Sequence, residues 1–259
     1  MPSATQFRII IVGGGIAGMA AAIALRGPNR QITVLEQSHL NTEIGATISL
    51  QPNATRILQH TWQLTNLVED SNGMLDHGLR IHKVDGALVN EIPLRSKTKY
   101  GADRVMWHRQ DLHAYLKQIA TSTQRDGPPA VIRTSSRVSH CDCEAGEVTF
   151  ESGETLTADL IVGADGIHSR IRTCVLGHEA KAVPTGSSAY RLMMTSDLLE
   201  KQAPHFCDKI NPRGKITMFK LRVRDRLTLY LNVTSPIYLN DHGTRLPSHH
   251  GPCARRRCV

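Results

Sequence analysis

Residues 9–36 carry the sequence feature that most constrains the fold. A short apolar, β-branched run, Ile9 to Val12, is typical of a buried strand. Three glycines in G-x-G-x-x-G spacing follow it: Gly13, Gly15 and Gly18. An alanine-rich apolar segment then predicts a helix, and a second apolar run, Ile32 to Leu35, ends in Glu36. This order of strand, glycine turn, helix, strand and acid indicates a dinucleotide-binding βαβ unit.

Each part of this unit has a physical task. Gly13 permits the tight turn, and Gly15 lacks the side chain that would keep a pyrophosphate away from the backbone. Gly18 lets the helix pack closely on the strand, and the free N–H groups at the helix N-terminus attract phosphate. Glu36 lies 18 residues after Gly18, a spacing that suits a hydrogen bond to a ribose hydroxyl.

The same stretch has a competing interpretation. Ile9 to Leu25 is a run of 17 residues without a charged or polar side chain, close to the lower limit for a membrane span and similar to a signal-peptide core. Four of the 17 residues are glycines, however, and the preceding flank holds a single basic residue, Arg8. We therefore expect neither a membrane segment nor a secretory signal.

Composition bounds the partners that the chain can have. Aromatic residues make up 4% of the 259 residues, which argues against stacking platforms for single-stranded nucleic acid. The formal charge is +8, and a basic tail over residues 241–259 contributes part of it. The remaining charge is ordinary for an enzyme that handles phosphates, so we expect no nucleic-acid partner.

The six cysteines predict neither a metal site nor a secreted protein. None forms a C-x-x-C pair, and none has histidines at zinc-ligand spacing. Scattered thiols without a disulfide pattern favour a reducing compartment, so we expect a cytoplasmic protein.

Small residues precede the next predicted helix. Ala46 and Thr47 lie in a segment that leads into a helix expected over residues 53–69. Their neighbourhood could let a flat cofactor ring lie on the backbone, but a tight loop before a helix explains the spacing equally well.

A hairpin and a further helix come next. Two strand-like runs over residues 79–92 flank Asp85 and Gly86, which is a strong turn signal. A helix is expected from about Arg109 to Thr121. An arginine at a helix start could bind a phosphate, although local sequence alone favours a surface salt bridge.

The last well-patterned segment predicts short strands. Four of them over residues 131–157 suggest a small β-meander, and Leu160 to Val162 suggests a buried parallel strand. Asp165 and Gly166 follow at its carboxyl end, where ligands of open α/β sheets bind.

Four motifs in this order resemble a known family. They are GGGIAG with its Glu36, EIGATISLQPNATRIL, WHRQDLHAYL and ADLIVGADGIHSRIR, and together they span about residues 8–172. The sequence is similar to the FAD-dependent aromatic-ring hydroxylases, single-component flavoprotein monooxygenases that include salicylate hydroxylase. Closest among them are the fungal enzymes of secondary metabolism.

The resemblance implies roles for several residues. It assigns Glu36 to the adenosine ribose of FAD, Arg109 to FAD, and Asp165 with Gly166 to FAD and the passing NAD(P)H. It therefore favours a cofactor contact over a surface salt bridge for Arg109. Thr47 departs from the family pattern, which usually has glycine there, so the close backbone approach is weakened at that position.

The signal is weaker beyond residue 181. Arg191 lies in an A-Y-R segment similar to the one that opens the family's substrate sheet. In that family an arginine there can stabilise a phenolate and would be the catalytic residue, whereas the sequence alone allows an exposed strand arginine equally well. A second hairpin is expected over residues 215–233, turning at 224–226.

These patterns predict an α/β protein whose FAD-binding domain is formed by two separate segments of the chain. A Rossmann-like FAD-binding domain, with a parallel sheet and a β-meander, is expected over residues 1–78 and 103–180. An inserted, mainly antiparallel and incomplete substrate sheet is expected over 79–102 and 181–240, followed by the irregular tail over 241–259.

The implied activity is hydroxylation of an aromatic or phenolic small molecule with FAD, NAD(P)H and O2. The chain contains no Gly-Asp dipeptide, the motif with which the family holds the flavin ribityl chain, and the pattern stops after about residue 239. We therefore expect a C-terminally truncated member. A catalytically inactive FAD or nucleotide binder and an NAD(P)-dependent dehydrogenase remain alternatives, and formation of a homo-oligomer stays open.

Overall fold

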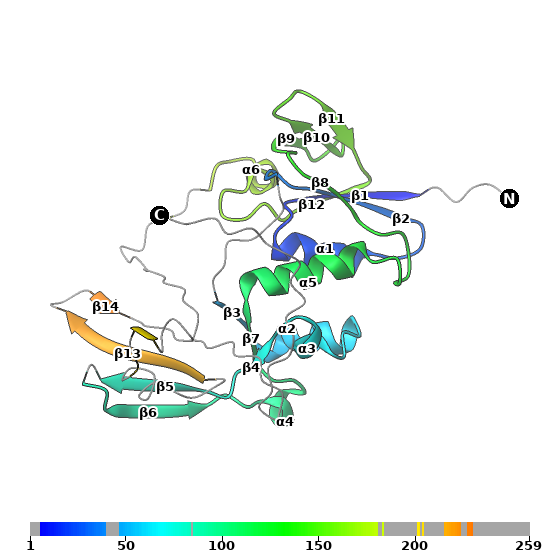
Figure 1. Cartoon of the computed structure of the whole chain (residues 1–259). Coiled ribbons are helices and arrows are strands. Elements are labelled where there is room, and N and C mark those ends of the chain that lie inside the picture. The colour runs from blue at the N-terminus through cyan, green and yellow to red at the C-terminus, as the bar shows by residue number, and fades with distance from the viewer. Residues whose placement is uncertain are drawn as a thin grey trace.

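The computed structural model describes residues 6–39, 47–83, 85–180, 183, 201–202, 204, 215–223 and 227–229. Within them four strands form a parallel sheet in the order β12-β1-β2-β8, which lies between the β9–β11 strands and the α1 and α5 helices (Figure 1). Its strands are β1 (Phe7–Val12), β2 (Arg30–Leu35), β8 (Val131–Arg133) and β12 (Leu160–Gly163). All three neighbouring pairs are parallel, as the βαβ pattern predicts.

Two details of this sheet correct the sequence predictions. β8 was expected in the meander, but it pairs in parallel with β2, with Val131 opposite Thr33. β12 was expected to be buried, but it is an edge strand, and Leu160 is 38% exposed. Local sequence indicates that a segment is an extended strand. Which strand it pairs with depends instead on the position at which the preceding crossover connection enters the sheet.

Each face of the parallel sheet is covered by a different layer. The face that carries Ile9, Ile11 and Val34 packs in one core with α1 and α5. The opposite face carries Ile10 and Val12 and packs against the meander and α6. These covering elements are α1 (Ile16–Leu25), α5 (Arg109–Thr121), α6 (Arg170–Leu176), β9 (Val138–Asp142), β10 (Glu147–Phe150) and β11 (Thr155–Thr157).

A small antiparallel sheet lies beyond α5, with strand order β3-β7-β4. Its strands are β3 (Thr47–Leu50), β4 (Met74–Leu75) and β7 (Val105–His108). The central strand β7 continues directly into α5, so this sheet is fixed to the helix that covers the parallel sheet.

The single helix expected over residues 53–69 is wrong. The segment instead forms α2 (Pro52–Arg56), the π-helical turn η1 (Ile57–Thr61) and, after a break, α3 (Leu67–Asp70). Gln63 takes a left-handed conformation, with φ of 56°, at the break. Glycine usually marks such a helix end, and the segment has none, so the sequence carried no signal for it.

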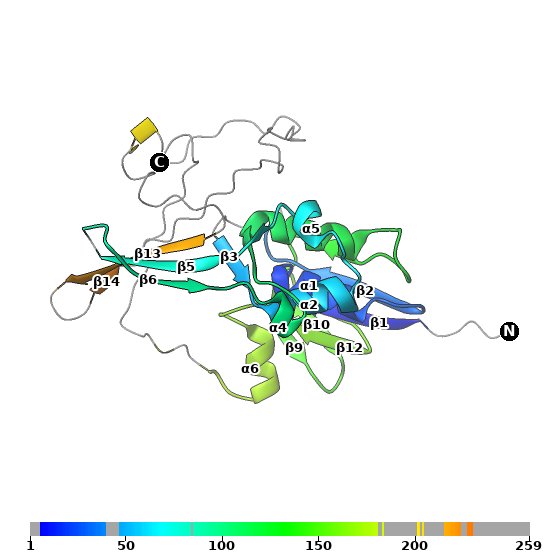
Figure 2. The same cartoon turned by 90° about the horizontal axis from the view of Figure 1, so that it is seen from below.

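A second four-stranded sheet has the order β14-β13-β5-β6. Its strands are β5 (Gly78–Lys83), β6 (Leu88–Pro93), β13 (Lys215–Val223) and β14 (Leu227–Leu229), and α4 (Lys97–Tyr100) follows β6. Both predicted hairpins are confirmed, and β13 lies parallel to β5 although the two are far apart in sequence. Figures 1 and 2 place this sheet beside the parallel-sheet layer, with β3 between them. The predicted domain boundaries stay a prediction.

The stretch from Ile9 to Leu25 does not form one continuous helix. It is divided between β1 and the ten-residue α1. No helix in the described part of the chain has the length and apolar character needed to cross a membrane.

Candidate functional site

The glycine turn begins at the carboxyl end of β1, where the chain leaves the parallel sheet. The N–H of Gly13 donates to the carbonyl of Leu35 over 2.8 Å, and the N–H of Ala164 donates to the carbonyl of Val12 over 2.7 Å. The turn is thus attached to both neighbouring strands. Gly13 has φ of 108°, and a Cβ at this position would lie 2.6 Å from the carbonyl carbon of Ala164. Only glycine fits here.

Gly18 allows α1 to pack against this turn. A Cβ at position 18 would lie 3.0 Å from the carbonyl carbon of Gly13 and would overlap the oxygen. The helix therefore starts immediately above the end of β1, as the fingerprint predicts.

The N-terminus of α1 keeps its amides available. Gly15 is the N-cap residue, no side chain caps the helix, and its first turn contains no acidic residue. The first N–H groups of a helix have no intrahelical partner, and the helix dipole gives this end a partial positive charge. The arrangement can therefore bind an anion through backbone N–H groups.

Glu36 lies at the end of β2, next to the glycine turn. One carboxylate oxygen accepts the N–H of Gly14 over 2.8 Å, and the other accepts the N–H of Ser38 over 2.7 Å. A carboxylate offers about four acceptor positions, so both oxygens can still accept a ligand hydroxyl. The structure thus brings together Gly13, Glu36 and the N-terminus of α1 in the way the sequence predicts.

His113 is part of this site and was missed by the sequence analysis. It lies on α5, is 3% exposed, and its Nε2 is 2.7 Å from the carbonyl oxygen of Gly14. A histidine one helical turn after Arg109 was the only available signal, and it did not identify the partner.

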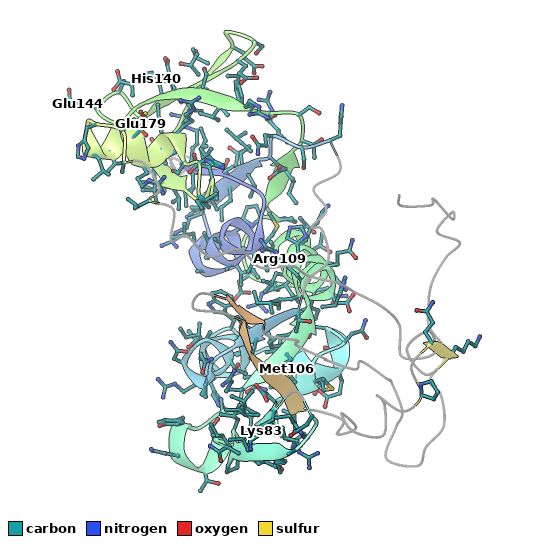
Figure 3. All side chains as sticks on the ribbon, turned by 90° about the vertical axis from the view of Figure 1, so that its left-hand side faces the viewer. Lys83, Met106, Arg109, His140, Glu144 and Glu179 are labelled. Atoms are coloured by element: carbon teal, nitrogen blue, oxygen red, sulfur yellow. The ribbon has the colours of Figure 1, made fainter. Side chains whose placement is uncertain are left out.

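Thr47 and Arg109 lie near each other through the pairing of β3 with β7. Thr47 is opposite His108 in this pair, and Arg109 is the next residue and the first of α5. Arg109 is half-buried, and Figure 3 shows it between the parallel-sheet layer and the part of the chain that carries Lys83. Two predicted site residues, Ala46 and Arg191, lie outside the described residues.

Asp165 and Gly166 follow β12 at the same edge of the parallel sheet as the glycine turn. A Cβ at Gly13 would lie 2.9 Å from the backbone nitrogen of Asp165. The carboxylate of Asp165 accepts the Ser169 hydroxyl over 2.5 Å and the N–H of Arg170 over 2.6 Å. It therefore holds the start of α6, a structural task that the motif alone did not indicate. Gly166 has φ of 77° and open space around the missing side chain.

A buried ion pair supports β3 from the other side. The carboxylate of Asp76 is fully buried, 3.2 Å from the guanidinium of Arg104. The guanidinium also donates to the Ser49 hydroxyl on β3 over 3.3 Å. Burial raises the pKa of Asp76, and the charge of Arg104 opposes that effect. No local sequence pattern indicates this pair.

The parallel sheet and the glycine turn at its edge define a Rossmann-like α/β fold. Residues 11–60 match the family model described as an NAD(P)-binding Rossmann-like domain. The chain is 37% identical to hispidin-3-hydroxylase of Neonothopanus nambi over 194 residues. The aligned region covers 74% of this chain and 45% of that protein. It is 37% identical over 180 residues to the FAD-dependent monooxygenase phomE' of Diaporthe leptostromiformis. The aligned region covers 66% of this chain and 44% of that protein.

A solved structure is similar as well. The tetrameric form of 2-methyl-3-hydroxypyridine-5-carboxylic acid oxygenase superposes with a TM-score of 0.55 at 28% identity, over 66% of this chain and 43% of that one. These similarities confirm the resemblance to FAD-dependent monooxygenases and the predicted fold class. The chain spans less than half the length of these relatives.

Proposed function

We propose that this chain forms the FAD-binding part of a flavin-dependent monooxygenase that hydroxylates an aromatic or phenolic small molecule with NAD(P)H and O2. The observation that carries the proposal is the convergence of three ligand-binding elements at one edge of the parallel sheet. The glycine turn follows β1, Glu36 follows β2, and Asp165 follows β12. Ligands of open α/β sheets bind at this edge.

The residues at this edge fit FAD. The uncapped N-terminus of α1 suits the pyrophosphate, because its free amides and dipole favour an anion. Glu36 has acceptor positions left for the ribose hydroxyls after its bonds to Gly14 and Ser38. Arg109, Ala46, Thr47, Asp165 and Gly166 are proposed to contact the cofactor as the resemblance implies, and Arg191 to contact the substrate.

FAD, when bound, supplies the redox chemistry and the activation of oxygen. The residues of this chain bind and orient it. The names of the relatives, a hydroxylase and an FAD-dependent monooxygenase, support the same class of reaction. We also infer a cytoplasmic enzyme of secondary metabolism with the discontinuous domain arrangement given above, and leave homo-oligomer formation open.

The visible spectrum of the purified chain tests the proposal. FAD is added, the excess is removed by gel filtration, and the retained flavin absorbance is measured before and after NADPH, and again in air. We expect retained flavin that NADPH bleaches and air restores, followed by hydroxylated product with a panel of phenolic acids. A folded chain that retains no flavin would contradict FAD binding. Retained flavin that NADPH does not bleach would favour an inactive FAD binder.

A matched pair of variants guards against non-specific flavin binding. Glu36→Ala removes the carboxylate at the proposed ribose position, whereas Glu151→Ala removes an exposed carboxylate that lies 3.6 Å from the Arg137 guanidinium. Retention of FAD should fall in the first variant and stay at the wild-type level in the second.

A further inference from the structure

The hydrogen bond between His113 and Gly14 fixes which nitrogen of a buried imidazole is the donor. The partner atom is a carbonyl oxygen, which can only accept, so Nε2 of His113 must carry the proton. The side chain is only 3% exposed, so water has little access to compete for the hydrogen bond to Gly14. His113 is therefore held in one orientation, with Nε2 as the donor, by the glycine turn.

The same bond also fixes the direction of the next peptide group. A peptide unit is planar and trans, so its C=O and N–H point in opposite directions. The carbonyl of Gly14 is turned toward buried His113, on the side where α5 packs. The N–H of Gly15 therefore points away from His113 and α5, and Gly15 itself is half-buried, whereas Gly14 is buried.

Gly14 is held at both ends. Its N–H donates to Glu36 over 2.8 Å, and its carbonyl accepts from His113 over 2.7 Å. Glycine has more backbone freedom than any other residue, so an unsupported turn would sample several peptide orientations. The two bonds select one of them before a ligand arrives, which lowers the ordering cost of binding.

We propose that His113 is a positioning residue for the phosphate site. Through the carbonyl of Gly14 it presents the N–H of Gly15 to the pyrophosphate of the bound dinucleotide. This inference deepens the proposed function and rests on it. A purely structural histidine would stabilise the packing of α5 on α1 without changing ligand affinity beyond its effect on folding.

Substitutions at position 113 separate these two roles. His113→Leu removes the donor, His113→Gln keeps an N–H near the position of Nε2, and His113→Asn carries an amide too short to reach Gly14. Leu116→Val is the matched control, because Leu116 is a buried α5 residue in the same core, 2% exposed, with an apolar side chain that donates no hydrogen bond. For each full-length variant, the dissociation constant for FAD and the thermal midpoint of the cofactor-free protein are measured.

The proposal expects FAD binding to weaken about tenfold in His113→Leu and His113→Asn, the effect of one lost hydrogen bond. Binding in His113→Gln should recover to within about threefold of the wild type. Leu116→Val should lower the thermal midpoint but leave the dissociation constant unchanged. Equal affinities in wild type and His113→Asn would overturn the inference while leaving the proposed function intact. Should His113→Leu not fold, the comparison of the asparagine and glutamine variants decides the question.

Hydrogen exchange covers the case in which the wild type binds no FAD. That result would contradict the proposed function by itself. The amide of Gly14, bonded to Glu36, should still exchange faster in His113→Asn than in the wild type and in Leu116→Val, because the turn has lost one of its two supports. Unchanged exchange would overturn the positioning role independently of FAD.

Discussion

Gly13 and Ala164 approach each other so closely that the end of β1 and the end of β12 form one surface. A Cβ at position 13 would lie 2.6 Å from the carbonyl carbon of Ala164, and Gly13 already has φ of 108°. Position 13 therefore needs glycine for two reasons. Its backbone has a positive φ, and a side chain would collide with Ala164. The second requirement is set by a strand that lies some 150 residues later in the sequence.

Gly13→Ala should destabilise the fold by about 3 kcal/mol, because backbone strain at a positive φ adds to a collision with backbone atoms that cannot move aside. Denaturant unfolding measures the loss. The control is Gly153→Ala, since Gly153 has φ of 86° but nothing within 4 Å of the added Cβ. That variant should lose about 1 kcal/mol from backbone strain alone. Equal losses in both variants would show that contact with Ala164 contributes nothing.

Comparison with Ser169 separates the helix-capping role of Asp165 from its proposed contact with FAD. Both side chains cap α6: Asp165 accepts the N–H of Arg170 over 2.6 Å, and Ser169 accepts the N–H of Arg172 over 2.9 Å. Asp165→Ala and Ser169→Ala should each cost about 1 kcal/mol of stability. Only Asp165→Ala should also weaken FAD binding beyond that cost, as isothermal titration would show. If both variants lost the same amount of affinity for FAD, Asp165 would act only as a helix cap.

The sequence predicted those parts of the site whose chemistry lies within one βαβ unit. Gly13, Gly18 and Glu36 could be assigned because their spacing alone fixes a turn, a close helix contact and an acid at a strand end. The position of Asp165 at the carboxyl end of a parallel strand was also predicted, and the structure places that strand beside β1. In each case a local pattern determines which atoms meet.

Other features depend on which distant segments pack together, and no local pattern reports that. His113 meets Gly14 across 99 residues, and the helical periodicity of α5 gives only the face on which the imidazole lies. β8 has the same extended pattern as the meander strands, yet it pairs with β2. The break at Gln63 likewise uses a left-handed conformation at a residue that does not favour it.

Arg26 should be a major support of the layer that covers the site. Its half-buried guanidinium donates to main-chain carbonyls around the C-terminus of α5, namely those of Ile119, Ala120, Ser122, Arg125 and Gly127. Arg26→Lys keeps the charge but replaces a planar fork of donors by a compact ammonium. We expect a loss of about 2 kcal/mol in the free energy of unfolding.

Arg30→Lys provides the comparison for Arg26. The Arg30 guanidinium is exposed and donates to the carbonyl of Leu25 over 3.0 Å. Its replacement should change the free energy of unfolding by less than about 0.5 kcal/mol. If both lysine variants unfold at the same denaturant concentration, the carbonyl contacts of Arg26 add no net stability.

Asp103 should make the fold sensitive to acid. Burial alone would raise the pKa of this carboxyl, but hydrogen bonds from the N–H groups of Ser96 and Lys97, at 2.7 and 2.9 Å, outweigh it with the help of Arg95 and lower the pKa. The folded-state pKa lies below the ordinary value of about 3.9, which applies to the unfolded chain. The carboxylate therefore stabilises the fold fully at any pH above about 3.9. Its contribution is lost as the pH falls through the lower folded-state pKa.

Asp103→Asn tests this dependence, since an amide oxygen can still accept both N–H groups but does not titrate. The variant should be less stable than the wild type at pH 7, because it lacks the charge, and the difference should shrink as the pH falls below about 4. Denaturant unfolding of both proteins from pH 7 to pH 3 gives the two curves. A difference that stays constant over this range would mean that the Asp103 carboxylate keeps its ordinary pKa in the folded protein.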